Sequence, residues 1–126
     1  HYPLRRQRQM CIRDRVNLAQ ALVEAGADII QTEGGTSSQP THAGVLGLIE
    51  KAAPTLAAAY SISQAVSVPV LCASGLSSVT VPMAIAAGAA GVGVGSAINQ
   101  LNDGVAMVAA VRALVEALET SPVKVA

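Results

Sequence analysis

The sequence has very few aromatic residues: it contains no Trp, no Phe and two Tyr among 126 residues. A core must then be built from Ala, Val, Leu and Ile, which suits helices that cover a parallel sheet. Charged residues make up only 13% of the chain and hydrophobic residues 52%, which excludes ordinary disorder. No apolar run reaches the roughly 18 residues that a membrane span needs. The net charge of zero gives no indication of nucleic acid or an anionic membrane as a partner.

Cysteine is equally scarce, with Cys11 and Cys72 as the two thiols. Two cysteines without a spacing pattern predict neither a disulfide framework nor a zinc site, and we expect no metal site. Cys72 stands in an apolar run, where a free cysteine usually behaves as a small buried hydrophobic residue. The sequence therefore favours a reducing compartment.

The charge is unevenly distributed, because residues 1–15 hold five arginines and one aspartate while residues 16–126 hold three cations and seven acids. A basic head can be a nucleic-acid arm or a targeting peptide. The string Arg8–Arg15, however, resembles translated sequencing-adapter read-through. We expect residues 1–15 to be a non-native basic head, and residues 16–126 to form the domain.

From Val16 onward, helical and strand patterns alternate, and alternation of this kind predicts a parallel α/β sheet. Helical spacing predicts a first helix that ends at Gly26. A long loop should carry a short helix at 45–52, with a new helix opening at Pro54, and Asp103 should cap the last helix. The expected strands are 27–32, 68–73 and 90–94, and the expected later helices are 54–66, 77–87 with Ser77 or Ser78 as its cap, a short one after Ser96, and 103–118.

Two successive expected strands end in small residues and glycine, as the last two strands of a (β/α)8 barrel do where they hold a phosphate. Three parallel strands leave two apolar edges open, and a complete barrel has about 250 residues. We therefore expect the C-terminal fragment of a (β/α)8 TIM-type barrel with about three βα units. The alternative is a small protein that pairs its sheet edges by forming a homo-oligomer.

Several strings resemble one family, the hypothetical chloroplast open reading frame twenty-three family of cyanobacteria and algal plastids. They are Asp28–Ser38, Pro40–His42, Gly44–Tyr60, Val70–Ser78, Gly91–Ala97 and Asn99–Asp103. The resemblance covers about Val16 to Glu119 and implies a TIM-barrel-like protein of unassigned function. It also implies the cyanobacterial cytosol or the plastid stroma as the compartment, and it supplies no catalytic residues.

Two residues are candidates for acid–base chemistry, although each has a structural alternative. Glu33 is the only acid at the three expected strand ends and could act as a general acid or base. It could equally pair with Lys51 or cap a helix. His42, the one histidine beyond the head, could move a proton, but a lone loop histidine is more often solvated or bound to backbone.

Glycines and serines at the second and third strand ends form the expected phosphate cradle. Glycine lets backbone N–H groups converge on an anion, and serine hydroxyls add donors. Small residues at these places can also simply permit tight strand–helix turns. The expected binding residues are Ser74, Gly75, Ser77, Gly93, Gly95 and Ser96.

Three functional hypotheses follow. The first is an enzyme, or the relic of one, that acts on a phosphorylated metabolite or uses flavin mononucleotide. The second is a non-catalytic regulatory barrel that binds a phosphate-bearing small molecule. The third is an interaction protein that assembles through its sheet edges and performs no small-molecule chemistry. The sequence leaves the choice between enzyme and binding protein open.

Overall fold

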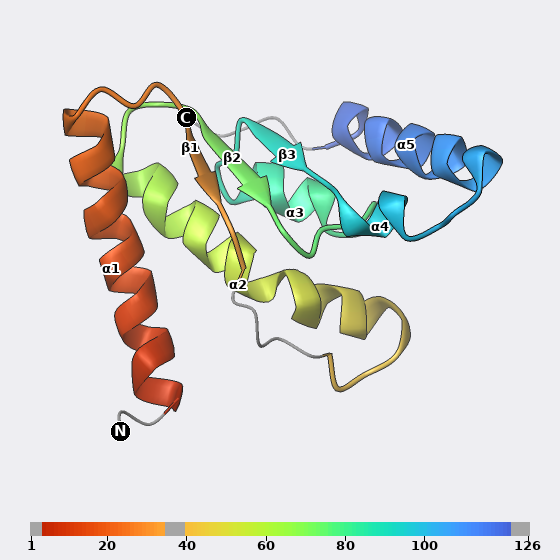
Figure 1. Ribbon diagram of the computed structural model, residues 1–126, viewed down its shortest axis with the longest axis horizontal. Coiled ribbons are helices and arrows are strands. Elements are labelled where there is room, and N and C mark those ends of the chain that lie inside the picture. The colour runs from red at the N-terminus through yellow and green to blue at the C-terminus, as the bar shows by residue number, and fades with distance from the viewer. Residues whose placement is uncertain (1–3, 35–39, 122–126) are drawn as a thin grey trace.

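The protein is described by a computed structural model, in which residues 4–34 and 40–121 are placed (Figure 1). Three strands alternate with helices along this part of the chain. The order is α1 (Leu4–Glu24), β1 (Ile30–Thr32), α2 (Gly44–Ala65), β2 (Val70–Ala73), α3 (Val81–Ala86), β3 (Gly91–Gly93), α4 (Ser96–Asn99) and α5 (Gly104–Glu119). None of the helices in the described residues is long and apolar enough to cross a membrane.

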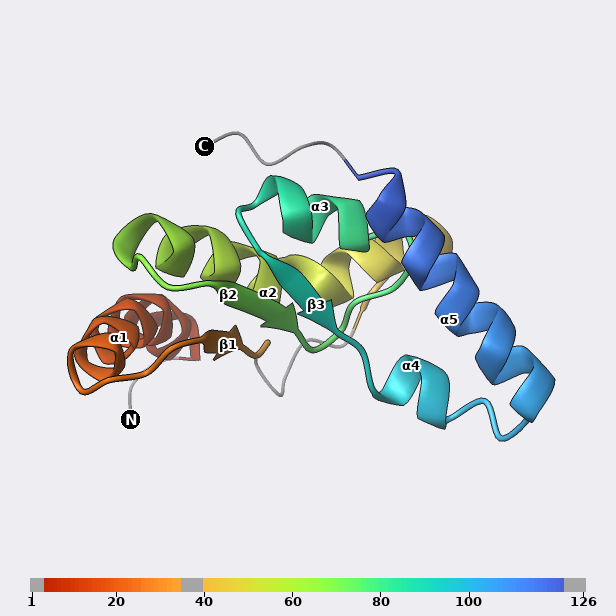
Figure 2. The ribbon, with the colours of Figure 1, turned by 90° about the horizontal axis from the view of Figure 1, so that it is seen from above.

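The three strands form one parallel sheet in the order β1-β2-β3, so each strand pairs with the next one in the sequence. Ile30 is the partner of Val70, and Cys72 is the partner of Val92. Helices α2 and α3 lie on the same face of this sheet (Figure 2). The expected α/β class with parallel strands is therefore confirmed. The strands are shorter than expected, because their N-terminal residues lie in the preceding turns.

The core lies between α2 and the sheet, and small residues allow the close approach. Ala52 and Ala59 of α2 are fully buried against a face that contains Val70 and Cys72. With neither Phe nor Trp available, alanine brings helix and sheet together, and each buried valine or isoleucine contributes about 1.5–3 kcal/mol. The opposite face bears Gln31, which is exposed, and Leu71, which is half-buried.

Helix α1 ends at Glu24, close to the predicted end, and Gly26 in the turn that follows adopts a φ of +111°. Only glycine enters that region without strain, so the helix stops there. At its other end α1 begins at Leu4, inside the basic head, and runs through Val16 without a break. The non-native origin of residues 1–15 stays a prediction.

The prediction of two helices separated by a loop between residues 45 and 66 was wrong. One helix, α2, runs over all of this region with Pro54 inside it. Proline lacks an N–H donor and crowds the preceding turn, so it is tolerated best in the first turn of a helix. In the sequence, Pro54 therefore indicated the start of a new helix. Here burial of Ala52 and Thr55 on either side of the proline stabilises the continuous helix.

The start of α3 was also predicted wrongly. Ser77 and Ser78 lie in a turn before the helix, and the flanking residue is Thr80, whose side chain does not cap it. The Thr80 hydroxyl instead accepts a hydrogen bond from the Ser77 N–H at 2.9 Å. By contrast, Asp103 caps α5 as predicted, since its carboxylate accepts from the Ala106 N–H at 3.0 Å. The short helix expected after Ser96 is α4.

Candidate functional site

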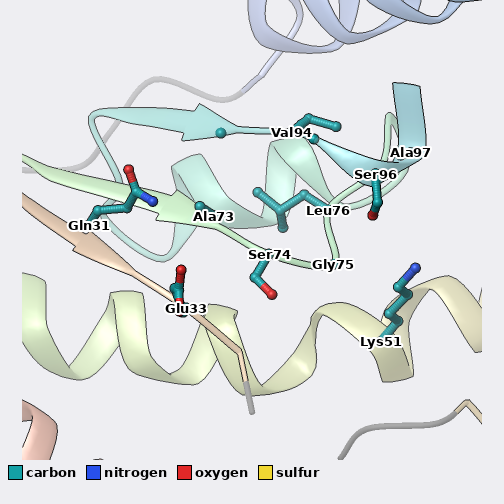
Figure 3. Close-up of a pocket in the computed structure, with 12 residues that line it drawn as sticks. Gln31, Glu33, Lys51, Ala73, Ser74, Gly75, Leu76, Val94, Ser96 and Ala97 are labelled. Carbon is teal, nitrogen blue, oxygen red and sulfur yellow. The ribbon is translucent and has the colours of Figure 1, made fainter. Parts of the chain in front are cut away.

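A cavity of about 380 Å³ opens at the carboxyl ends of the three strands (Figure 3). The ends of β1, β2 and β3 and the residues that follow them line it, together with one residue from α2 and the start of α4. The lining residues are Gln31, Glu33, Lys51, Ala73, Ser74, Gly75, Leu76, Gly93, Val94, Gly95, Ser96 and Ala97. Ligands of parallel α/β proteins bind at this end of the sheet.

The end of β2 contributes an unusual backbone to the cavity wall. Ser74 and Gly75 both have positive φ, at +81° and +76°. That conformation is costly for serine, and glycine is required at the next position because a Cβ there would lie 2.7 Å from the carbonyl oxygen of Lys51. The chain therefore turns sharply over α2, and the exposed Ser74 side chain lies at the cavity.

The end of β3 contributes the second glycine-containing segment. Gly93, Gly95 and Ser96 line the same cavity, and a Cβ built on Gly95 meets no atom within 4 Å. The helix that follows, α4, has only four residues. Its dipole is too short to supply much positive charge, since the macrodipole sums over many aligned peptide units.

Glu33 follows β1 and lines the cavity, so the structure brings it together with the expected cradle residues. Its backbone carbonyl accepts a hydrogen bond from the Arg15 guanidinium at 2.7 Å, which fixes the chain at this point. Its carboxylate forms no ion pair with Lys51 within the described part of the chain. An acid–base role for Glu33 stays a prediction.

His42 is not among the residues that line the cavity. Its Nδ1 lies 2.7 Å from a carboxylate oxygen of Glu50, and the N–H of His42 donates to the same oxygen at 3.1 Å. The Thr41 hydroxyl donates to the other oxygen at 2.8 Å. These contacts lower the pKa of Glu50, and the hydrogen bond from the Thr41 side chain has the largest effect. These hydrogen bonds hold Thr41 and His42 against the first turns of α2, so the contacts of His42 are those of a residue that stabilises the loop.

Ser77 is the one expected cradle residue that does not line the cavity. The cavity instead contains Lys51 and Gln31, which the sequence analysis did not select as binding residues. Gln31 had a detectable signal, since it alternates with Ile30 and Thr32 in an expected strand and must face away from the core. Lys51 had none, because its place depends on how α2 packs under the end of β2.

A buried network of hydroxyl groups supports the cavity from below. Thr55 of α2 is fully buried, and its hydroxyl donates to the carbonyl of Ala73, the last residue of β2. A hydroxyl has one proton, so the Thr32 hydroxyl, 2.8 Å away, must be the donor to Thr55. Helix α2 is thereby attached to the ends of β1 and β2 directly before the residues that line the cavity.

The sheet, its helical layer and this cavity define a parallel α/β protein with a ligand-sized opening at the strand ends. The profile of the family described as "Protein of unknown function (DUF561)" matches residues 9–124. The chain belongs to this family. The match includes residues 9–15, inside the basic head.

The relatives agree with the resemblance that the sequence strings indicated, which is thereby confirmed. The chain is 39% identical over 69 residues to "Uncharacterized protein ycf23" of Pyropia yezoensis, which is 55% of this chain and 25% of that protein. It is 39% identical over 67 residues to the protein of that name from Porphyra purpurea, which is 53% of this chain and 25% of that protein. The matched segment thus spans about a quarter of these relatives. No solved structure matches the chain.

Proposed function

We propose that the chain binds a phosphate-bearing small molecule in the cavity at the ends of β2 and β3. The observation that carries this proposal is the composition of the cavity wall. Backbone from Gly75, Gly93 and Gly95, the hydroxyls of Ser74 and Ser96, and the ammonium group of Lys51 meet at one opening. A phosphate dianion is bound by this combination of N–H donors, hydroxyl donors and one cation.

The strained backbone at Ser74 is a second support. A serine in the left-handed region costs of order 1–3 kcal/mol and persists only where the surrounding structure holds it. Such residues gather at ligand sites. The burial of Thr55, which holds the preceding Ala73 carbonyl, supplies the restraint here.

The proposal includes the fold of the complete protein, which we take to be a (β/α)8 barrel with these strands as its last three. Sequential parallel order, open edges at β1 and β3, and helices on one face favour it. Helix α5 also has no buried residue, and its valines at positions 105, 108, 111 and 115 are exposed. Further barrel units would cover this apolar face. We retain the cyanobacterial cytosol or plastid stroma as the compartment.

Two alternatives make different predictions. A homo-oligomer built from these edges would give a monodisperse assembly of residues 1–126, whereas a barrel fragment on its own should aggregate. A cooperatively unfolding monomer of residues 1–126 would contradict the barrel. Flavin mononucleotide as cofactor predicts flavin absorbance in the purified complete protein, although the described residues of the cavity wall include no aromatic one.

The test of phosphate binding is a matched pair of substitutions at Gly95, where an added Cβ meets no atom within 4 Å. Gly95→Asp puts a carboxylate where the anion belongs, and Gly95→Asn adds a side chain of the same shape without charge. In the complete protein, binding of inorganic phosphate and simple phosphate esters, measured by calorimetry, should be lost in Gly95→Asp and largely kept in Gly95→Asn. Equal binding by both variants would refute the site.

A further inference from the structure

The cavity has two chemically different sides. Figure 3 shows Gln31 and Glu33 on one side, and Lys51, Ser96 and Ala97 on the other. Gln31 and Glu33 come from β1 and the residue after it, whereas Ser96 begins the helix after β3. The acidic, polar side therefore lies at the end of β1, whereas the cationic side lies where Lys51 of α2 and the start of α4 meet.

Charge decides how a ligand lies between the two sides. A phosphate dianion is attracted to the ammonium group of Lys51 and repelled by the carboxylate of Glu33. The Arg15 guanidinium near Glu33 is bound to the Glu33 carbonyl and does not line the cavity, so the dianion should occupy the Lys51 side. An ionised carboxylate only accepts hydrogen bonds. The part of the ligand that reaches Glu33 must therefore carry a hydrogen-bond donor.

We infer that the cavity selects phosphomonoesters whose other end carries hydroxyl or ammonium donors, with Lys51 binding the phosphate and Glu33, assisted by Gln31, accepting from the donors. Phosphorylated polyols, sugars and amino alcohols belong to this class. Phosphate esters of apolar alcohols do not, because they offer no hydrogen-bond donor to the exposed Glu33 carboxylate. The inference rests on the proposed phosphate site and adds specificity to it.

The neighbouring residues agree with a small polar ligand. The Gln31 amide offers both a donor and an acceptor next to Glu33 and can complete the hydrogen bonds of a hydroxyl group. Leu76, which is buried, and Val94 are the larger apolar residues of the wall, and the wall residues that the structure describes offer no aromatic face on which a ring could stack. Shape and chemistry thus favour hydroxyl-bearing ligands over flat rings.

The experiment compares two ligands with the same three-carbon skeleton on the complete protein by calorimetry. Glycerol 3-phosphate carries two free hydroxyls, and n-propyl phosphate carries none. Wild-type protein should bind glycerol 3-phosphate about tenfold more tightly, the value of one hydrogen bond to a charged group. Phosphoethanolamine tests the ammonium donor, and a preference for it over n-propyl phosphate supports the inference equally.

Two variants separate the roles of the two sides. Glu33→Gln keeps the shape and replaces the charged acceptor by a neutral amide, so the preference for glycerol 3-phosphate should be reduced while inorganic phosphate still binds. Lys51→Met should lose all three esters and inorganic phosphate. If wild-type protein binds both C3 esters equally, or if Glu33→Gln weakens both equally, the inference is overturned although the phosphate site stands. If no phosphate compound binds wild type, the proposed function itself fails.

Discussion

The Oγ1 atoms of Thr32 and Thr55 lie 2.8 Å apart in the core, joining the last residue of β1 to the middle of α2. The Thr55 hydroxyl in turn donates a hydrogen bond to the carbonyl of Ala73, so two strand ends share one helical hydroxyl. Pairs of buried hydroxyls are strong only when every member has a partner. This arrangement is thus the link between the packed core and the position of the cavity.

The network predicts a specific stability change at Thr55. Thr55→Val keeps the shape of the side chain but removes the acceptor of the Thr32 hydroxyl and the donor to Ala73. We expect the free energy of unfolding to fall by about 1–3 kcal/mol, the cost of buried groups left without partners. Urea denaturation of the complete protein measures it.

Thr55→Ser is the control for that substitution, because it keeps the hydroxyl and loses only a methyl group. Its loss should be about 1 kcal/mol, close to the value of one buried methylene. A Thr55→Val variant as stable as the wild-type protein would mean that the hydroxyl network contributes nothing to stability.

Gly75 gives the second prediction, because its φ is +76° and a Cβ would lie 2.7 Å from the Lys51 carbonyl. Gly75→Ala should destabilise the protein by more than about 2 kcal/mol, since the left-handed backbone alone costs 1–2 kcal/mol. Gly104→Ala in α5 is the control, because a Cβ there meets nothing within 4 Å. It should be neutral or slightly stabilising, and equal losses in the two thermal melts would contradict this account.

Local patterns predicted the parts of the fold that depend on local chemistry. The cap at Asp103, the stop at Gly26 and the glycine-rich ends of β2 and β3 each follow from what one residue type permits in its own backbone. Pro54 misled for the same reason, because its local effect is to begin a helix. Burial along α2, a tertiary effect, overrides that preference.

In the candidate site, too, the sequence predicted the residues that depend on local chemistry and missed the one that depends on tertiary packing. Residues directly after strands could be selected from sequence, because parallel strands bring their carboxyl ends to one edge. Lys51 could not, because it lies on a helix, far from any strand end in the sequence. It comes to the cavity only because Gly75 lets the chain turn closely over the carbonyl of Lys51.

Glu50 predicts an effect of acid on the loop before α2. Hydrogen bonds from Thr41 and then His42 lower the pKa of this carboxyl, so the folded state holds it ionised to lower pH than the unfolded state does. The contribution to stability is present above the ordinary carboxyl pKa and is lost as pH falls through the lowered value. Carboxyl NMR titration should give a midpoint for Glu50 below the ordinary value of about 4.3.

Substitutions at Thr41 test the cause of that shift. Thr41→Val removes the hydroxyl that donates to Glu50 at 2.8 Å and should raise the Glu50 midpoint toward the ordinary value. Thr41→Ser keeps the donor and should leave the midpoint low. A midpoint unchanged in Thr41→Val would assign the shift to His42 instead.

Cys72 predicts how the stability of the protein changes at alkaline pH. The thiol is fully buried, and burial raises its pKa. The unfolded state therefore loses this proton at a lower pH than the folded state, so stability should fall as pH rises from the ordinary thiol range near about 8.5 toward the raised value. Below that range the contribution is complete.

The measurement uses a Cys11→Ser background, so that Cys72 is the only thiol left in the chain. Cys72→Ala loses buried volume and should be less stable by about 1 kcal/mol near neutral pH. The Ala variant has no thiol to ionise at this position. The difference in urea midpoint between the Cys72 protein and the Cys72→Ala variant should therefore narrow as the pH rises above the ordinary thiol pKa of about 8.5. Iodoacetamide should label Cys72 slowly in the native protein and rapidly in urea. Rapid native labelling, or a gap that is constant with pH, would show that the thiol is open to solvent and that the strand end above Thr55 is not held closed.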